Sequence, residues 1–257
     1  MSNEHDLHPG AATAVLDDLH AKAGELPAVD LVDLEAKRVA ATNAMLRDLR
    51  REDARKRWDL ACPDRLKTSD WAHPRLAPYL PQINRVLGYQ IGTKGLLASG
   101  PTGRGKTRSM WQLMRRLGVD DGLDVRYWTA SDWFTTLQNQ INYGRDDARG
   151  WVEAVASRHV VFIDDLGQEA IQTNREDWAS GWFFRFLDIR VGLGLPLFIT
   201  TNLTAREIAG RNAGVRANPL VRRLLDLCDP VTFETAAEKS DREAHEVRPR
   251  YRADIDG

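Results

Sequence analysis

The sequence predicts an α/β fold in which a parallel sheet of five strands is flanked by helices. Three observations predict it: short apolar runs alternate with longer stretches of helical periodicity, one run leads into a glycine-rich loop, and another ends in two adjacent aspartates. Such alternation is typical of parallel strands joined by helical crossovers. The candidate strands are Gly95 to Ser99, Val125 to Trp128, Val160 to Asp164, Leu197 to Thr201 and Val231 to Phe233.

The chain has 257 residues. This is enough for one α/β domain and a smaller extension, because a single hydrophobic core stops growing at roughly 250 to 300 residues. We expect three parts. Residues 1–75 form an N-terminal region that is partly disordered and carries a small helical extension, residues 76–235 form the core domain, and residues 236–257 form a charged C-terminal tail.

One long helix is predicted in the N-terminal region, from Asp30 to Trp58. This stretch has no glycine or proline, and Asp30 can serve as its N-cap. Between Lys37 and Arg57 it carries eight basic and three acidic residues, an excess of 8 − 3 = +5. A basic amphipathic helix can bind a partner or the phosphates of DNA, but charge runs are as often solvated faces. Its apolar residues at mostly helical spacing are Leu31, Leu34, Met45, Leu46 and Leu49.

Composition excludes several classes of protein. The net charge of −1 gives the chain as a whole no electrostatic case for binding nucleic acid, so any such case must be local. No apolar run approaches the roughly 20 residues that cross a bilayer, and the polar start lacks a secretory signal. Cys62 and Cys228 have no spacing suited to zinc or to a disulfide framework. We expect a cytoplasmic protein that has no membrane segment.

The strongest motif is the glycine-rich loop between the first predicted strand and the helix after it. Its glycines permit backbone conformations that point successive N–H groups at phosphate oxygens, and the helix start adds positive potential. Lys106 then reaches the β- and γ-phosphates, and Thr107 offers a hydroxyl to Mg²⁺. The motif therefore predicts binding of ATP with magnesium. Its residues are Gly100, Pro101, Thr102, Gly103, Arg104, Gly105, Lys106 and Thr107.

Two acids end the predicted strand from Val160. Carboxylates at the end of a buried strand are unfavourable without a cation. Asp164 is therefore expected to assist the metal and Asp165 to polarise the attacking water. Because glutamate is more common in the second place, the shorter Asp165 leaves the rate of hydrolysis open.

Two weaker signals follow. The amide of Asn202, after the strand from Leu197, could orient water near the γ-phosphate, although threonine and asparagine at strand ends commonly form local turns. Arg222 and Arg223 lie on a predicted helix after Pro219, where a guanidinium could stabilise a phosphoryl group or simply face solvent.

Together these elements resemble the AAA+ ATPases, and among them the DnaC/IstB branch of helicase loaders and transposition helper ATPases. The resemblance covers about residues 58–235 and rests on GPTGRGKT, IDDLG, TTNLT and VRRLL. It implies a P-loop AAA+ fold. Only 257 − 223 = 34 residues follow Arg223, so the lid domain is expected to be truncated.

The resemblance also implies a role for each matching position. Lys106 and Thr107 correspond to Walker A, Asp164 and Asp165 to Walker B, and Asn202 to sensor 1. This makes Thr107 and Asp164 the metal residues. It makes Asp165, Asn202 and a trans-acting arginine the catalytic ones. Arg223 is the expected finger, with Arg222 as the alternative, and a finger of this kind implies a homo-oligomer.

The function that the resemblance implies is an ATP-dependent DNA replication protein that loads a replicative helicase onto single-stranded DNA. The helix from Asp30 would contact the helicase, unless its leucine stripe packs on its own core. DNA would lie near Gln140 to Trp151, which holds Arg145 and Arg149. Two alternatives stay open: an IstB-like helper whose partner is a transposase, and a nucleotide-binding adaptor with negligible hydrolysis.

Overall fold

The structure is a computed structural model that describes residues 31–68, 71–167, 176–203, 217–235, 237, 238 and 240. By packing, the chain divides into two units, residues 1–48 and 49–257. The described part of the first unit is the start of helix α2, Leu31–Ala61, on which Leu34, Met45 and Leu46 are exposed. The expected disorder of the first residues and the expected charged tail fall almost wholly outside the described residues. The division near residue 75 stays a prediction.

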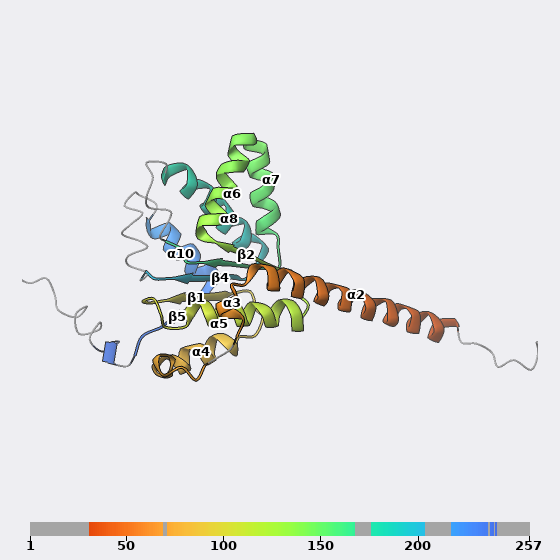
Figure 1. The fold of residues 1–257 in the computed structure, drawn as a ribbon. Coiled ribbons are helices and arrows are strands. Elements are labelled where there is room, and N and C mark those ends of the chain that lie inside the picture. The colour runs from red at the N-terminus through yellow and green to blue at the C-terminus, as the bar shows by residue number, and fades with distance from the viewer. Residues whose placement is uncertain are drawn as a thin grey trace, which may run out of the picture. The chain divides into compact units, whose positions relative to one another are not determined.

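The second unit is built on a five-stranded sheet with the order β2-β3-β4-β1-β5 (Figure 1). Every pair of neighbouring strands is parallel. The strands are β1 Gly95–Ser99, β2 Val125–Thr129, β3 Val160–Asp164, β4 Leu197–Thr201 and β5 Cys228–Thr232. The predicted fold class is therefore confirmed.

The fifth strand starts three residues before the predicted Val231 and ends before Phe233. Asp229 and Pro230 hide its start in the sequence, because neither residue type favours a strand. Strand β5 lies at the edge of the sheet, where proline is tolerated because one side of the strand needs no N–H donor.

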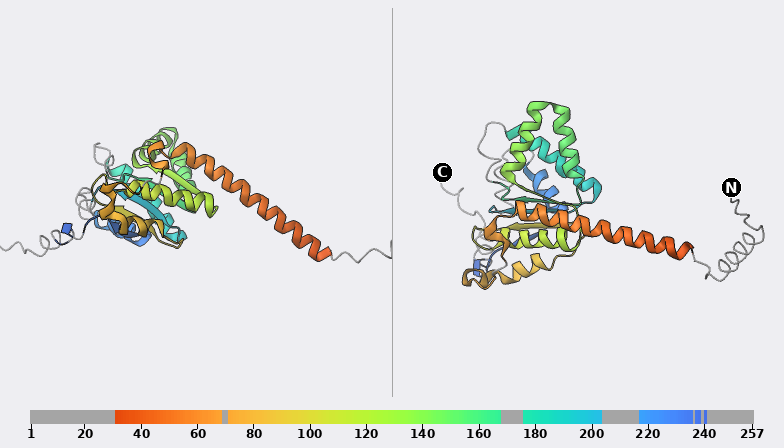
Figure 2. Two further views of the ribbon diagram at one scale, coloured as in Figure 1. Left: turned by 60° about the horizontal axis from the view of Figure 1, so that its bottom comes forward. Right: turned by 45° about the vertical axis from the view of Figure 1, so that its right-hand side comes forward.

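Helices cover both faces of the sheet. On one side lie α6 Ala130–Tyr143, α7 Arg145–Ala156, α8 Glu176–Leu193 and α10 Ala217–Leu227, and on the other lie α4 Leu80–Leu87 and α5 Lys106–Arg115 (Figures 1 and 2). The shorter elements are α3 Asp64–Lys67, the 3-10 helix Pro74–Tyr79 and a π-helical turn, Arg116–Asp120, that continues α5.

The two faces of the sheet bury separate hydrophobic clusters. Trp133 and Phe186, both fully buried, lie in the cluster under α6, α7 and α8. Trp58, Met110 and Phe162 lie in the cluster under α5, and the indole N–H of Trp58 donates to the carbonyl of Trp111 at 3.1 Å. The last turns of α2 are therefore part of the second unit.

A fully buried arginine joins three elements on the side of the sheet that holds the Trp133 cluster. Arg190 of α8 donates to the carbonyls of Ala156, Arg158 and His159 at 3.0, 2.9 and 3.3 Å, and also to that of Pro196. Burial lowers its pKa to about 10. The arginine thus ties α8 to the end of α7 and to the start of β4.

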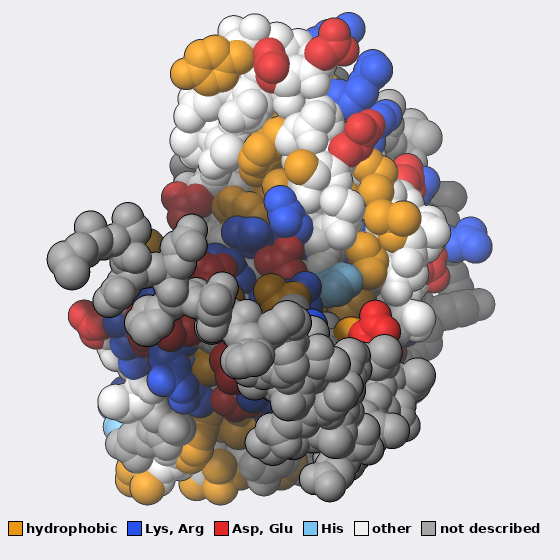
Figure 3. Space-filling model, turned by 90° about the vertical axis from the view of Figure 1, so that its right-hand side faces the viewer, with side chains coloured by type: hydrophobic (Ala, Val, Ile, Leu, Met, Phe, Trp, Pro, Cys, Tyr) orange, Lys and Arg blue, Asp and Glu red, His pale blue; other side chains and the backbone are white. Residues whose placement is uncertain are grey.

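Within the described ranges, no helix has both the length and the apolar character needed to cross a membrane. On the face drawn in Figure 3, charged side chains are interspersed with apolar ones.

Candidate functional site

The glycine-rich loop connects β1 to α5, and its glycines take the backbone conformations that the motif requires. Gly100, Gly103 and Gly105 have φ angles of 127°, 84° and 91°. At Gly100 a Cβ would also lie 2.7 Å from the carbonyl oxygen of Phe233, so no larger residue fits. No side chain caps the start of α5 at Lys106, which leaves the N–H groups of its first turn available to an anion.

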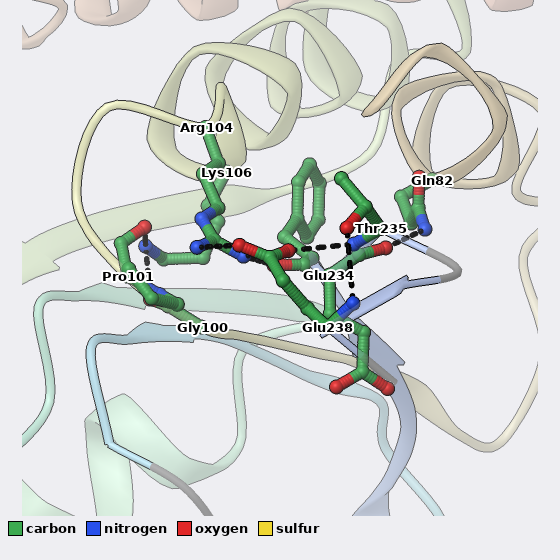
Figure 4. A network of polar contacts seen from close by, with 9 residues as sticks. Gln82, Gly100, Pro101, Arg104, Lys106, Glu234, Thr235 and Glu238 are labelled. Carbon is green, nitrogen blue, oxygen red and sulfur yellow. Dashed lines mark hydrogen bonds and ion pairs between the residues drawn. The ribbon is translucent and has the colours of Figure 1, made fainter. Parts of the chain in front are cut away.

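Lys106 lies buried beneath the loop, with 4% of its surface exposed. Its Nζ donates to the carbonyls of Gly100 at 2.6 Å and Pro101 at 2.8 Å (Figure 4), and to Oδ1 of Asn202 at 3.0 Å. Burial lowers the pKa of Lys106 to about 8, because the ammonium loses its hydration. The described hydrogen bonds of this cation are thus all to neutral oxygens.

Asp164, at the tip of β3, receives two hydroxyl groups. Thr107 donates to Asp164 Oδ1 at 3.1 Å, and Thr200 of β4 donates to the same oxygen. Burial raises the pKa of Asp164 above its ordinary value, and the charge of neighbouring Asp165 raises it further. A cation bound beside this buried carboxyl, which already accepts hydrogen bonds from two hydroxyls, would stabilise its ionised form.

Asp165 follows in a left-handed conformation, with a φ of 59° that is uncommon for a residue other than glycine. The conformation is held by its own N–H, which donates to Thr200 Oγ1 at 2.9 Å. Its carboxylate is exposed and accepts a hydrogen bond from Asn202 Nδ2 at 3.0 Å. Asn202 therefore bridges Lys106 and Asp165, with its oxygen toward the ammonium and its nitrogen toward the carboxylate.

Arg104 is the loop residue whose side chain points to the C-terminal segment. Its guanidinium donates to both carboxylate oxygens of Glu238, at 2.8 and 2.6 Å, and to the carbonyl of Phe233 at 2.7 Å (Figure 4). Glu238 also accepts a hydrogen bond from the N–H of Thr235 at 2.7 Å, while its own N–H donates to Thr235 Oγ1 at 3.2 Å. Such a capping box starts a helix, so the loop and the start of the next segment share one carboxylate.

The structure brings five of the predicted residues into one contact network: Lys106, Thr107, Asp164, Asp165 and Asn202. Sequence reasoning missed two partners. Thr200 lay within a recognised motif without an assigned role, and its place at the tip of the strand beside β3 was the available signal. Glu238 gave no signal, because 134 residues separate it from Arg104.

Arg223 lies on α10 and is oriented by α8. Its guanidinium donates to the carboxylate of Asp188 and lies 5.2 Å from the ring centroid of Phe184. The neighbouring Arg222 is exposed. The assignment of the finger to Arg223 stays a prediction.

No family model matches the sequence, and no curated protein matches it either. The crystal structure of the DnaC helicase loader superimposes with a TM-score of 0.52 at 19% identity, over 67% of this chain and 100% of the other. The chain has the fold of the DnaC helicase loader.

Two further solved structures superimpose on this chain with lower TM-scores. The crystal structure of DnaI has a TM-score of 0.49 at 20% identity, over 66% of this chain and 87% of the other. The replication initiator DnaA, bound to AMPPCP and single-stranded DNA, has a TM-score of 0.48 at 15% identity, over 66% of this chain and 52% of the other. The predicted resemblance to the DnaC/IstB branch is confirmed at the level of the fold.

Proposed function

We propose that this DnaC-like protein is an ATP-dependent DNA replication protein that loads a replicative helicase onto single-stranded DNA. One observation carries the proposal: the tips of β1, β3 and β4 join a buried lysine, two acids and an amide in a single network beneath a glycine-rich loop. Ligands of open parallel sheets bind at this carboxyl edge, beyond the strand ends.

The residues of the loop fit the triphosphate of ATP. The glycines at positive φ and the uncapped start of α5 supply N–H donors, and Lys106 supplies a buried positive charge. Because the described hydrogen bonds of Lys106 are to neutral oxygens, a phosphate oxygen can replace one of them and bring charge pairing. ATP supplies the phosphoryl group, and the chain's own contribution is to hold and orient it.

Thr107 and Asp164 fit Mg²⁺. The 3.1 Å between their oxygens is close to the about 3.0 Å that separates adjacent ligands of an octahedral Mg²⁺ with bonds of about 2.1 Å. The two residues can therefore serve one ion, directly or through its water. The raised pKa of Asp164 also fits a metal site, since a bound cation would favour the ionised form of this buried carboxyl.

Asp165 and Asn202 are proposed to position the attacking water. The exposed carboxylate of Asp165 can accept a proton from that water, and the left-handed backbone turns the carboxylate away from the strand. Asn202 holds the carboxylate by a hydrogen bond of 3.0 Å and reaches the lysine with its other end.

Hydrolysis is proposed to occur between subunits, with Arg223 acting on ATP bound by a neighbouring copy. Asp188 and Phe184 would hold that guanidinium in place in the free protein. Arg222, which is exposed one residue earlier, is the alternative. An arginine supplied in trans makes turnover depend on assembly, so the isolated subunit should be slow.

Single-stranded DNA is proposed to contact the hairpin of α6 and α7. Tyr143 is 81% exposed at the turn between the two helices, and Arg145 and Arg149 are exposed on α7. An exposed aromatic ring beside two guanidinium groups can stack on a base and attract the backbone.

The first experiment measures binding of a non-hydrolysable ATP analogue, followed by helicase delivery. We expect Lys106→Ala to abolish nucleotide binding and Asp165→Asn to retain binding while losing turnover. Arg115→Ala, half-buried at the opposite end of α5 from the loop, is the matched control for Lys106. Undiminished affinity of Lys106→Ala for the analogue would refute the site.

Partner assays then separate the remaining readings. Sizing chromatography with a hexameric helicase, with a transposase, and with each plus single-stranded DNA shows which complex forms when nucleotide is present. Capture of the transposase alone would replace the helicase-loading proposal. ATP binding with no change of turnover or disassembly in Asp165→Asn would replace it with the adaptor.

A further inference from the structure

A cavity of about 340 Å³ lies at the opposite edge of the sheet, where the strands begin. Asp124 and His159, which contribute to its wall, stand directly before β2 and β3, whereas Asp164 ends β3. A five-residue strand places these two edges roughly 15 Å apart. The cavity is therefore separate from the candidate nucleotide site.

The wall of the cavity carries more guanidinium groups than carboxylates. Arg50 and Arg57 come from α2, Arg126 from β2, and the acids are Asp53 and Asp124. In Figure 3, blue and red side chains gather beside a pale-blue histidine in the middle of the face.

Asp124 is shared among three arginines. Its carboxylate lies 3.2 Å from Arg126 Nε, 3.2 Å from an amino nitrogen of Arg158 and 3.9 Å from one of Arg57. Arg57 also pairs with Asp53. Among the residues that line the cavity, three guanidinium groups face two carboxylates, so the lining holds a net charge of 3 − 2 = +1, and Arg158 adds a further guanidinium on Asp124 from outside the lining.

One buried N–H donor in this wall is unsatisfied. Within the described structure, Nε of Arg57 makes no hydrogen bond, while Nε of Arg126 has only its ion pair with Asp124, at 3.2 Å. A buried donor without an acceptor is unfavourable, and a guanidinium presents its donors in a planar fork that suits the oxygens of an oxyanion. The cavity, at about 30 Å³ per water, could hold roughly eleven waters and has room for such a group.

We propose that this cavity is a second binding site, specific for phosphoryl groups and independent of the nucleotide loop. The surplus of positive charge suits a phosphate, which carries about −1.5 to −2 at neutral pH. The phosphoryl group can belong to a small phosphate compound or to the backbone of single-stranded DNA. Arg57 supplies the unsatisfied donor, Arg126 supplies a second guanidinium in the wall, and Arg50 lies at the exposed rim.

The test uses the full chain with pyrophosphate as the probe, and it is repeated in the Lys106→Ala background so that binding at the glycine-rich loop is separated from binding at the cavity. Calorimetric titration should show pyrophosphate binding to the wild type. Arg126→Gln and Arg50→Gln should each weaken it by at least about tenfold. The control is Arg55→Gln, an exposed arginine on the same helix that does not line the cavity, and its affinity should stay within about twofold. Since Arg50 is exposed, its variant keeps the test valid if Arg126→Gln fails to fold.

Two results would overturn the proposal: no pyrophosphate binding by the wild type at millimolar concentration, or equal weakening in all three variants, which general electrostatic attraction would produce. A short oligothymidylate distinguishes the sources. If its affinity falls in Arg126→Gln and pyrophosphate competes with it, the site takes the DNA backbone. If the affinity for the oligonucleotide is unchanged in Arg126→Gln while the affinity for pyrophosphate falls, the site takes a small phosphate compound.

Discussion

The buried lysine of the loop should make nucleotide affinity depend on pH in a range where an ordinary lysine stays charged. Burial lowers the pKa of Lys106 to about 8. If only the ammonium form binds the triphosphate well, affinity follows the protonated fraction, which falls from about 0.76 at pH 7.5 to about 0.09 at pH 9. We therefore expect the association constant for ATP to fall about eightfold between these pH values. A lysine with the usual pKa of about 10.4 would change by only about 4%.

The sign of the effect gives a second readout. A bound phosphate stabilises the ammonium and raises its pKa, so binding takes up the proton that the free lysine lacks. At pH 8, where about half of the free protein is deprotonated at Lys106, uptake should approach about half a proton per nucleotide. Over this pH range the phosphates of ATP, with a second pKa of about 6, are already ionised and add little.

Isothermal titration calorimetry with a non-hydrolysable analogue measures both quantities, the proton uptake coming from buffers of different ionisation enthalpy. Lys106→Arg is the control, because a guanidinium stays charged throughout and should give weaker but pH-independent binding. A wild-type association constant that changes less than twofold from pH 7.5 to pH 9 would refute the reasoning. So would the absence of proton uptake at pH 8.

Three further outcomes are expected. Arg190→Met leaves two buried and two partly buried carbonyls without their donor and should lower the free energy of unfolding by about 3 to 5 kcal/mol in urea titration; a loss below about 1 kcal/mol would contradict the role of this arginine. Gly95→Ala would bring Cβ to 1.9 Å from a backbone oxygen of β4 and should lower the free energy of unfolding by about 2 kcal/mol or more. The control Gly92→Ala, whose Cβ would have nothing within 4 Å, should change it by less than about 0.5 kcal/mol. Equal changes in the two variants would be evidence against the close packing of β1 and β4. Glu238→Gln removes a negative charge from beside the loop and should tighten ATP binding, while Arg104→Gln removes a positive charge and should weaken it. Titration with the non-hydrolysable analogue measures both affinities. Weaker binding in both variants would indicate that the ion pair only orders the loop.

Three strands, β1, β3 and β4, could be predicted to within one residue because each lies inside the sheet and begins as a buried apolar run. The edge strand β2 could be predicted equally well from its valine and aromatic residues, although it contains Arg126. The fifth could not, because Pro230 and the exposed Asp229 are allowed only by its edge position, and that position depends on the order of strands in the sheet. Sequence patterns identify strands well but do not determine which strands are neighbours.

The same limit applies to the site. Lys106 and Asp164 could be predicted because each belongs to a motif contained within one strand tip and the residues after it. The partners that cross between elements could not be predicted: Glu238 approaches Arg104 from another part of the chain, and the cavity around Asp124 draws on three separate segments. These contacts arise from the tertiary fold and leave no local pattern.

The strand order explains why β4 supplies the connecting residues. In the described sheet β4 lies between β1, which leads into the phosphate loop, and β3, which ends in the two acids, although it follows both in sequence. A side chain at its tip can therefore reach the elements on either side: Thr200 holds Asp164, and Asn202 reaches both Lys106 and Asp165. An amide suits this place because it accepts a hydrogen bond from an ammonium while it donates to a carboxylate, whereas an acid at position 202 would repel Asp165. A bound phosphate that draws Lys106 away would free the amide oxygen of Asn202, while the amide nitrogen would still donate to Asp165. One side chain, Asn202, therefore links phosphate binding to the position of the Asp165 carboxylate.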